Sequence, residues 1–295
     1  MLLGHKKELD FLKTLATEGR LGHGYIFFGA DGVGKRKVAE ELCGFLESES
    51  SITSPKPLPA GRQVSLNKER DTRILQDSRF IIHDSSGSIG IDAVRAARMW
   101  LSLKPATSSR RTLVIDEAEK MAGEAQNALL KIAEDPPGAG LIILITRDPE
   151  LLQFTLASRF QDIYFAPVPK EDILVWLKKE HGVPEEKARR ATERSFGRPG
   201  LAYRLCFDEA LRGVLENAEK FLAGSFSYGG GVKQLVADEA FDLERFLEAV
   251  ILVLSWRGRE KISARVWHDV VSLREQASRF NLNPRIQLEA LATMI

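Results

Sequence analysis

The segment Gly24-Tyr-Ile-Phe-Phe-Gly29-Ala-Asp-Gly-Val-Gly34-Lys35-Arg36 decides the fold of this chain. It opens with a short apolar run of β-prone residues, continues through a glycine-rich turn, and leads into a helical pattern over residues 35–46. The spacing of Gly29, Gly34 and Lys35 fits the pattern Gly-x-x-x-x-Gly-Lys, and the pattern stands between a strand and a helix. The sequence therefore predicts a phosphate-binding loop.

The predicted loop lacks one group that a nucleotide site needs. Backbone N–H groups around Gly29, Gly32 and Gly34 would cradle a polyphosphate, and Lys35 would reach its β and γ oxygens. The next position normally supplies a Ser or Thr hydroxyl to Mg²⁺, but Arg36 stands there. A guanidinium has no lone pair for a metal and brings a like charge beside it, so we expect hydrolysis to suffer more than binding. Whether ATP still binds stays open, and the alternative is a glycine-rich turn that only joins strand to helix.

Further apolar runs alternate with helical patterns in the first half of the chain. Strands are predicted at 79–83, 112–116 and 141–146, and helices at 91–103 and 117–134. Strands of continuous Ile, Leu and Val separated by helices are typical of a parallel sheet that is covered on both faces. The predicted fold class is therefore α/β.

The composition changes along the chain and suggests three domains. Residues 1–166 form the predicted nucleotide-binding-like domain, and a Pro- and Ser-rich stretch at 48–72 is predicted to be a flexible insertion within it. The β signal then ends, and helical patterns predict a small helical lid at 167–212. A Gly- and Ser-rich break leads into further amphipathic helices, which predict an all-α C-terminal domain at 213–295.

Two adjacent carboxylates, Asp116 and Glu117, follow the apolar strand predicted at 112–116. Ligands bind at the carboxyl ends of strands in open parallel sheets, so this pair fits a Walker B box. In a working NTPase, Asp116 would hold Mg²⁺ through water and Glu117 would orient the attacking water. The alternative, that Asp116 only caps the next helix, is weaker because the phosphate loop precedes it.

Bulk composition excludes several classes of protein. Lys and Arg total 42 against 41 Asp and Glu, a formal net charge of +1, so no global positive field favours nonspecific nucleic-acid binding. The two cysteines, Cys43 and Cys206, are far apart in sequence and predict buried thiols, not a disulfide framework or a zinc site. No stretch is apolar enough for a signal core or a membrane span, so we expect a cytoplasmic protein.

The segment Pro149-Glu-Leu-Leu-Gln-Phe-Thr-Leu-Ala-Ser158-Arg159-Phe160 resembles the "PExLLPTIxSRC" segment of bacterial clamp-loader AAA+ subunits, with Phe160 in place of the cysteine. Residues 23–29, 89–105, 116–137 and 283–289 resemble other motifs of that family in the same order. The chain is thus similar to the delta-prime type of DNA polymerase III clamp-loader subunit. In that family the arginine matched by Arg159 acts in trans on the ATP of a neighbouring subunit.

The resemblance implies an AAA+ α/β domain, a helical lid and a helical collar that joins subunits. It implies a stationary subunit of the DNA-directed DNA polymerase holoenzyme, which is not an efficient ATPase by itself. Its partners would be the motor subunits and the clamp-opening delta subunit, and indirectly the sliding clamp and primer-template DNA. Many relatives hold a four-cysteine zinc module before the acidic strand, but only Cys43 lies in that interval here, so no zinc is expected.

Two other functions remain as alternatives. An ATP-hydrolysing motor subunit of the gamma/tau type would require that Arg36 be tolerated, with Mg²⁺ held by phosphates and Asp116 alone. A phosphate-loop protein outside replication, such as a small-molecule kinase, would need acceptor-site residues, and the sequence offers no such set. The first of these differs from the stationary subunit in one property, turnover of ATP by the isolated chain.

Overall fold

The structure is a computed structural model that describes residues 2–50, 72–76, 79–82, 88–103, 108–224, 231–237, 241–257, 263–277, 280 and 282–294. Two compact units divide the chain, Met1–Ala202 and Tyr203–Ile295. The domain limits expected at 166 and 212 remain predictions. Of the insertion expected at 48–72, residues 51–71 lie outside the described residues, whereas 48–50 are helical and Thr72 begins a strand.

The first unit is built on a six-stranded sheet with the order β2-β3-β4-β5-β1-β6. Every neighbouring pair is parallel except β2 with β3, which is antiparallel. The strands are β1 (Gly24–Phe28), β2 (Thr72–Gln76), β3 (Arg79–Ile82), β4 (Arg111–Ile115), β5 (Gly140–Thr146) and β6 (Gln161–Tyr164). Strands β4 and β5 are buried along their whole lengths, as expected for the interior of a covered sheet. The predicted α/β class is confirmed.

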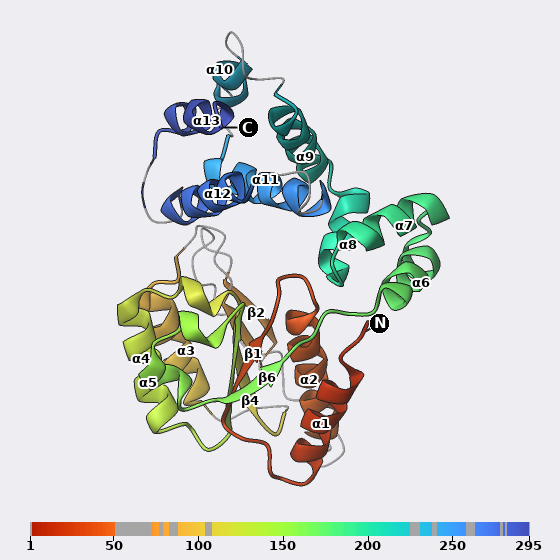
Figure 1. The fold of residues 1–295 in the computed structure, drawn as a ribbon. Helices are drawn as coiled ribbons and strands as arrows, with labels where there is room; N and C mark the ends of the chain where they lie inside the picture. Colours follow the sequence, from red (N-terminus) through yellow and green to blue (C-terminus); the bar gives the residue numbers. More distant parts are fainter. Residues whose placement is uncertain are drawn as a thin grey trace. The chain divides into compact units, whose positions relative to one another are not determined.

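Helices cover both faces of this sheet (Figure 1). On one face, α1 (Lys6–Thr17) and α2 (Lys35–Ser50) bury Leu12 and Leu42 against apolar side chains of the strands. The other face carries α3 (Ile91–Leu101), α4 (Gly123–Glu134) and the short α5 (Phe154–Ala157), which share a second apolar cluster. Burial of these two clusters is the main favourable contribution to the stability of the unit.

The prediction of one continuous helix over residues 117–134 is wrong for its first turn. Glu117 has a left-handed φ of 51°, a 3-10 turn, η1 (Ala118–Lys120), follows, and Met121 is extended and forms an isolated parallel bridge with Ile89. Helix α4 begins only at Gly123. The apolar spacing hid this break because Met121 is buried in the same cluster as the helical residues behind it.

The remaining helices follow the sheet. In the first unit, α6 (Lys170–His181) packs on α7 (Glu185–Arg194). Residues 199–222 form two helices, α8 (Pro199–Phe207) and α9 (Glu209–Leu222), because Asp208 accepts a hydrogen bond of 2.9 Å from the Leu211 N–H and starts a new helix. In the second unit, α11 packs on α9 and α12. Its other helices are α10 (Gly231–Val236), α11 (Leu243–Arg257), α12 (Ala264–Ala277) and α13 (Pro284–Ala292).

No helix among the described residues is long and apolar enough to cross a membrane. Cys43 and Cys206 are both buried free thiols, in agreement with the interpretation as core residues. Burial raises the pKa of Cys43 to about 12, so this thiol stays protonated at neutral pH.

Replacement of Gly29 tests whether the loop after β1 needs a glycine at this position. Gly29 has a φ of +134°, and a Cβ there would lie 2.5 Å from the Phe165 carbonyl oxygen. We expect Gly29→Ala to lower the free energy of unfolding by about 2–4 kcal/mol, measured by urea denaturation. Gly44→Ala in α2 is the matched control: its Cβ meets nothing within 4 Å, so it should stabilise the chain by about 1 kcal/mol. Equal effects of the two changes would contradict the tight loop.

Candidate functional site

The candidate site lies at the carboxyl edge of the sheet, where three strands end side by side. Strands β4, β5 and β1 are consecutive and parallel in the sheet. The loop 29–36 follows β1, Asp116 follows β4, and Arg147 follows β5. The structure therefore brings the predicted phosphate loop and the predicted Walker B pair together, as expected for an open α/β sheet.

The glycines of the predicted phosphate loop take up left-handed or strained backbone conformations. Gly29, Gly32 and Gly34 have φ values of 134°, 77° and 119°, which side chains with a Cβ rarely adopt. The start of α8 rests directly on it: the Gly200 N–H donates to the Gly32 carbonyl at 2.8 Å, and a Cβ at Gly200 would lie 3.0 Å from the Gly32 Cα. The first turn of α8 thus covers the loop at the place where the backbone turns.

Lys35 points back into its own loop. Its side chain is buried, and its Nζ donates to the Gly29 carbonyl and, at 3.1 Å, to the Ala30 carbonyl. Asp31 lies 3.8 Å from the same nitrogen. Burial lowers the pKa of Lys35, and the carboxylates of Asp31, Glu119 and Asp116 oppose that shift. The ammonium group that would reach a β or γ phosphate is occupied by loop carbonyls.

Arg36 contacts the carboxylate that was predicted to hold the metal. Its Nη1 lies 3.3 Å from Asp116 Oδ2, and its Nε lies 3.1 Å from Glu40 Oε1. The Asp116 side chain is only 16% exposed, so this ion pair is partly shielded from water. A cation therefore lies beside Asp116 where a working site would carry Mg²⁺.

Glu117 is held in an unusual conformation. Besides its left-handed backbone, its Oε2 lies 2.9 Å from Lys120 Nζ, and its N–H donates to Asp116 Oδ1 at 3.1 Å. Strained residues of this kind are found at functional sites, and they persist because the surroundings fix them. The alternative of a helix cap is not what the structure has, because Asp116 accepts from its immediate neighbour and no side chain caps η1.

Sequence reasoning missed a third basic residue of the site, Arg147. Its Nε lies 2.7 Å from Asp31 Oδ2 in the loop and 3.4 Å from Glu119 Oε1, two residues after Glu117. One signal could have found it: Arg147 is the first residue after β5, at the same sheet edge as the loop. Arg147, Arg36 and Lys35 together leave the acidic side chains of the site paired with cations of the same chain.

Arg159 is not part of this site. It lies between α5 and β6, where its Nη2 is 3.3 Å from Glu134 Oε1 and its Nη1 is 3.3 Å from Ser158 Oγ. Because β6 runs parallel to β1, a residue that precedes β6 lies at the amino edge of the sheet. The loop follows β1 at the carboxyl edge, so Arg159 and the loop lie at opposite ends of two adjacent strands.

Among the described residues, no three His, Cys, Asp or Glu side chains are arranged to hold a metal ion. Most of the interval in which a zinc module would stand is not among them. The absence of zinc therefore stays a prediction. The donor set around Asp116 also fits Mg²⁺ poorly, since Arg36 already contacts that carboxylate.

Comparison with known proteins identifies the family. The family model described as DNA polymerase III, delta subunit, matches residues 4–169, more than half of the chain. The chain belongs to this family. Within it, the subunit delta' of Escherichia coli (strain K12) is 34% identical over 118 residues, which cover 40% of this chain and 35% of that protein. The subunit tau of Salmonella typhimurium (strain LT2) is 29% identical over 201 residues, or 66% of this chain and 30% of that one.

These alignments span about a third of the length of both relatives, so they do not decide which type of DNA polymerase III subunit the chain is. The fold is matched over nearly the whole length. A DNA polymerase III gamma subunit-related protein from Thermotoga maritima aligns with 97% of both chains at a TM-score of 0.54 and 20% sequence identity. Our chain, a member of the DNA polymerase III family, thus has the predicted AAA+ α/β fold followed by helices.

The pH dependence of stability tests the position of Lys35. An unfolded chain releases this proton near the ordinary lysine pKa of about 10.4, and burial lowers the folded-state pKa below that value. Between the two values the unfolded state binds more protons, so the contribution of Lys35 to the free energy of unfolding rises with pH. The difference in unfolding free energy, native chain minus Lys35→Met, should therefore increase as the pH is raised toward about 10.4, the ordinary lysine pKa, in urea titrations.

Lys37→Met removes the same charge from the half-exposed part of α2 and controls for the general effect of one charge less. A difference for Lys35→Met that stayed flat or fell as the pH rose would mean that Lys35 is not buried in the loop.

Proposed function

We propose that the chain is a stationary, delta-prime-type subunit of a clamp loader that supplies Arg159 to the ATP site of a neighbouring subunit. The observation that carries this proposal is the position of Arg159 at the amino edge of the sheet. Strand β1 has five residues, so the two edges are separated by about 15 Å at the usual rise per residue. A side chain at one edge cannot serve the loop at the other, but it can reach a nucleotide in another chain.

The segment that leads to Arg159 exposes two large apolar side chains. Phe154 is 85% exposed and Leu151 is 53% exposed, and both lie in the short segment before Arg159. Exposed large aromatic side chains are enriched at protein interfaces. The ion pair of Arg159 with Glu134 is itself half-exposed, so giving it up for a phosphate costs little.

The chain's own loop supports a stationary role. Lys35 donates to loop carbonyls and Arg36 contacts Asp116, so Mg²⁺ and a triphosphate would have to displace both. A gamma/tau-type motor, the alternative, needs these groups to be available in each cycle. In this proposal the partners are the motor subunits and the delta subunit, and indirectly the sliding clamp and primer-template DNA, in the cytoplasm.

The role of Arg159 is tested in an assembly reconstituted with motor subunits. Arg159→Ala should lower single-turnover ATP hydrolysis at the one site that it reaches by about a thousandfold, the usual effect of an arginine finger. Assembly, followed by size-exclusion chromatography, should be unchanged, because the replaced side chain makes only a half-exposed ion pair. The other sites of the assembly should continue to hydrolyse ATP.

Arg20→Ala is a matched control, since Arg20 is also an exposed arginine paired with a single glutamate, Glu18. It should leave both turnover and assembly as they are in the native chain. An Arg159→Ala assembly that hydrolyses ATP as fast as the Arg20→Ala assembly would contradict a role in trans.

Replacement of Arg36 by threonine tests whether Arg36, which contacts Asp116, prevents nucleotide and Mg²⁺ from binding. Arg36→Thr removes the cation from Asp116 and returns a metal ligand, so Mg²⁺-dependent binding of a fluorescent ATP analogue should tighten by about tenfold or more. Titrations with Mg²⁺ and with EDTA, monitored by fluorescence anisotropy, measure the effect. Steady-state ATPase assays of the native chain should show no turnover above background.

Lys37→Thr makes the same change of charge and side chain one residue along α2, away from Asp116, and should not improve binding. Brisk turnover by the isolated native chain would favour the motor alternative and reject the stationary role.

A further inference from the structure

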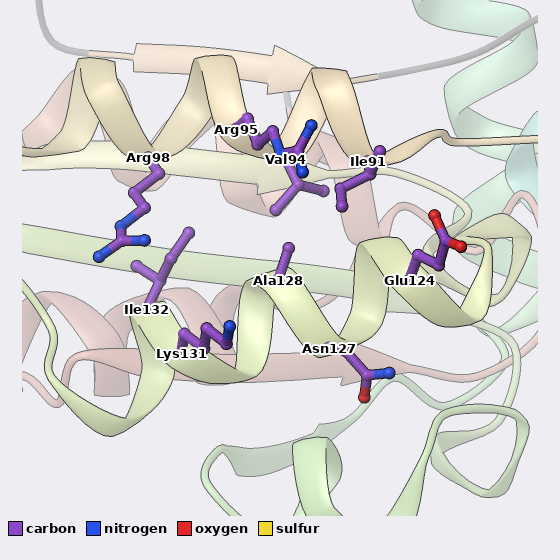
Figure 2. A pocket seen from close by; sticks show the side chains of 9 residues that line it. All are labelled: Ile91, Val94, Arg95, Arg98, Glu124, Asn127, Ala128, Lys131 and Ile132. Carbon is purple, nitrogen blue, oxygen red and sulfur yellow. The ribbon is translucent and has the colours of Figure 1, made fainter.

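A groove of about 410 Å³ lies between α3 and α4 (Figure 2). Only residues of these two helices line it. Its volume lies in the range of about 300–1,000 Å³ that is usual for ligand pockets. None of the roles considered so far uses this groove.

The floor of the groove is apolar. Val94 and Ile132 are buried in the core cluster, Ala128 is half-buried against it, and Ile91 closes one end. Val94 and Ile132 are 0% and 2% exposed, so the strip of apolar surface that is open between the two helices comes from Ala128 and Ile91. An apolar side chain of a partner that entered this strip would be removed from water, which is the main source of binding free energy at such sites.

Three cations stand along the rim. Arg95, Arg98 and Lys131 line the groove and are exposed. Arg95 lies 3.5 Å from Asp92, but Arg98 and Lys131 have no ion-pair partner among the described residues. These two unpaired charges offer the groove a strong preference for anionic groups.

The charges are distributed unevenly along the groove. Figure 2 shows Arg98 and Lys131 together with Ile132 at one end, and Glu124 with Ile91 at the other. A bound anion is therefore attracted to the Arg98 end and repelled from the Glu124 end. Asn127, on the Glu124 side, can donate or accept a hydrogen bond with a peptide backbone.

We propose that this groove is a docking site for an acidic segment of a partner protein. Carboxylates of the segment would pair with Arg98 and Lys131, and a neighbouring apolar side chain would lie on Ala128 and Ile91. The charge complementarity sets the direction of the segment, with its acidic end at Arg98 and away from Glu124. This site is separate from the function proposed above.

Nucleic acid fits the same groove less well. Proteins that bind single strands combine cations with aromatic side chains on which bases stack, and no aromatic residue lines this groove. Glu124 would also face a phosphate backbone that extended along the whole groove. The apolar floor has no role in binding phosphates, whereas a peptide uses both the floor and the rim.

Fluorescence anisotropy with the full chain and a labelled peptide, acetyl-Asp-Asp-Glu-Leu-Leu-Gly-amide, tests the proposal. The native chain should bind it, and two altered peptides should bind about tenfold more weakly. One has Asn and Gln in place of the acidic residues, and the other has Ser in place of the leucines. Equal binding of the serine peptide would overturn the proposal, because the apolar floor would then have no part.

Variants of the groove locate the peptide. Arg98→Glu and Lys131→Glu should each weaken binding by about tenfold, since each places a like charge next to the peptide. Ala128→Phe fills the strip without a change of charge and should abolish binding. Circular dichroism and thermal unfolding identify any variant that fails to fold, and the two surface charge reversals keep the test valid if Ala128→Phe is unstable.

Arg190→Glu is the matched control, because Arg190 is an exposed arginine on α7, outside the groove. It should bind the peptide as the native chain does, and an equal loss in this variant would overturn the proposal. A thymidine oligonucleotide is the second probe. If it binds with dependence on Arg98 and Lys131 while the peptide does not, the groove binds nucleic acid and the proposal fails.

Discussion

The parallel register of β1 with both of its neighbours is the constraint on which the rest of the first unit depends. Gly24 is aligned with Ile142 of β5, and Tyr25 is aligned with Gln161 of β6. Because these three strands run in the same direction, every loop that follows a strand lies at one edge of the sheet and every segment that precedes one lies at the other. The chain therefore has two chemically different edges, one with the glycine loop and one with Arg159.

Charge pairing explains why the ionised side chains around the loop contact groups of the same chain. A buried lysine and several carboxylates at one sheet edge would be unstable if they lacked partners, since uncompensated charges lose their hydration. Here Asp31 is paired with Arg147, and Asp116 is paired with Arg36. Arg36 stands where a metal-binding hydroxyl is expected, and it supplies to Asp116 the positive charge that Mg²⁺ would have brought. The arginine and the paired carboxylates therefore balance each other's charge.

The parts of the fold that could be predicted are those fixed by local sequence. The buried strands β4 and β5 are continuous apolar runs, and the loop is recognisable from the spacing of its glycines and Lys35. Strand β6 was missed because Gln161–Tyr164 is polar and takes its place only by pairing with β1. The break at Met121 was missed because its bridge partner, Ile89, is far away in sequence.

The same distinction applies to the site. The loop and the Asp116 pair were predicted from motifs, and the structure brings them together. Arg147 follows a predicted strand, but its contact with Asp31 joins residues that meet only once the order of β5 and β1 in the sheet is known. Motif reasoning finds the residues that a motif itself contains, and it misses partners that the sheet topology brings from elsewhere in the chain.

Two arginines of this chain, Arg36 and Arg159, differ in their surroundings. Arg36 is paired with two carboxylates, and those of Glu40 and Asp116 are 30% and 16% exposed. Arg159 has one carboxylate partner, Glu134, which is 49% exposed. Water and salt screen the second arrangement far more than the first, so Arg36 is held on its partners while Arg159 can exchange Glu134 for another anion at little cost. The guanidinium of Arg36 thus pairs with Asp116 at one edge of the sheet. The guanidinium of Arg159, at the other edge, is held by one exposed carboxylate only among the described residues.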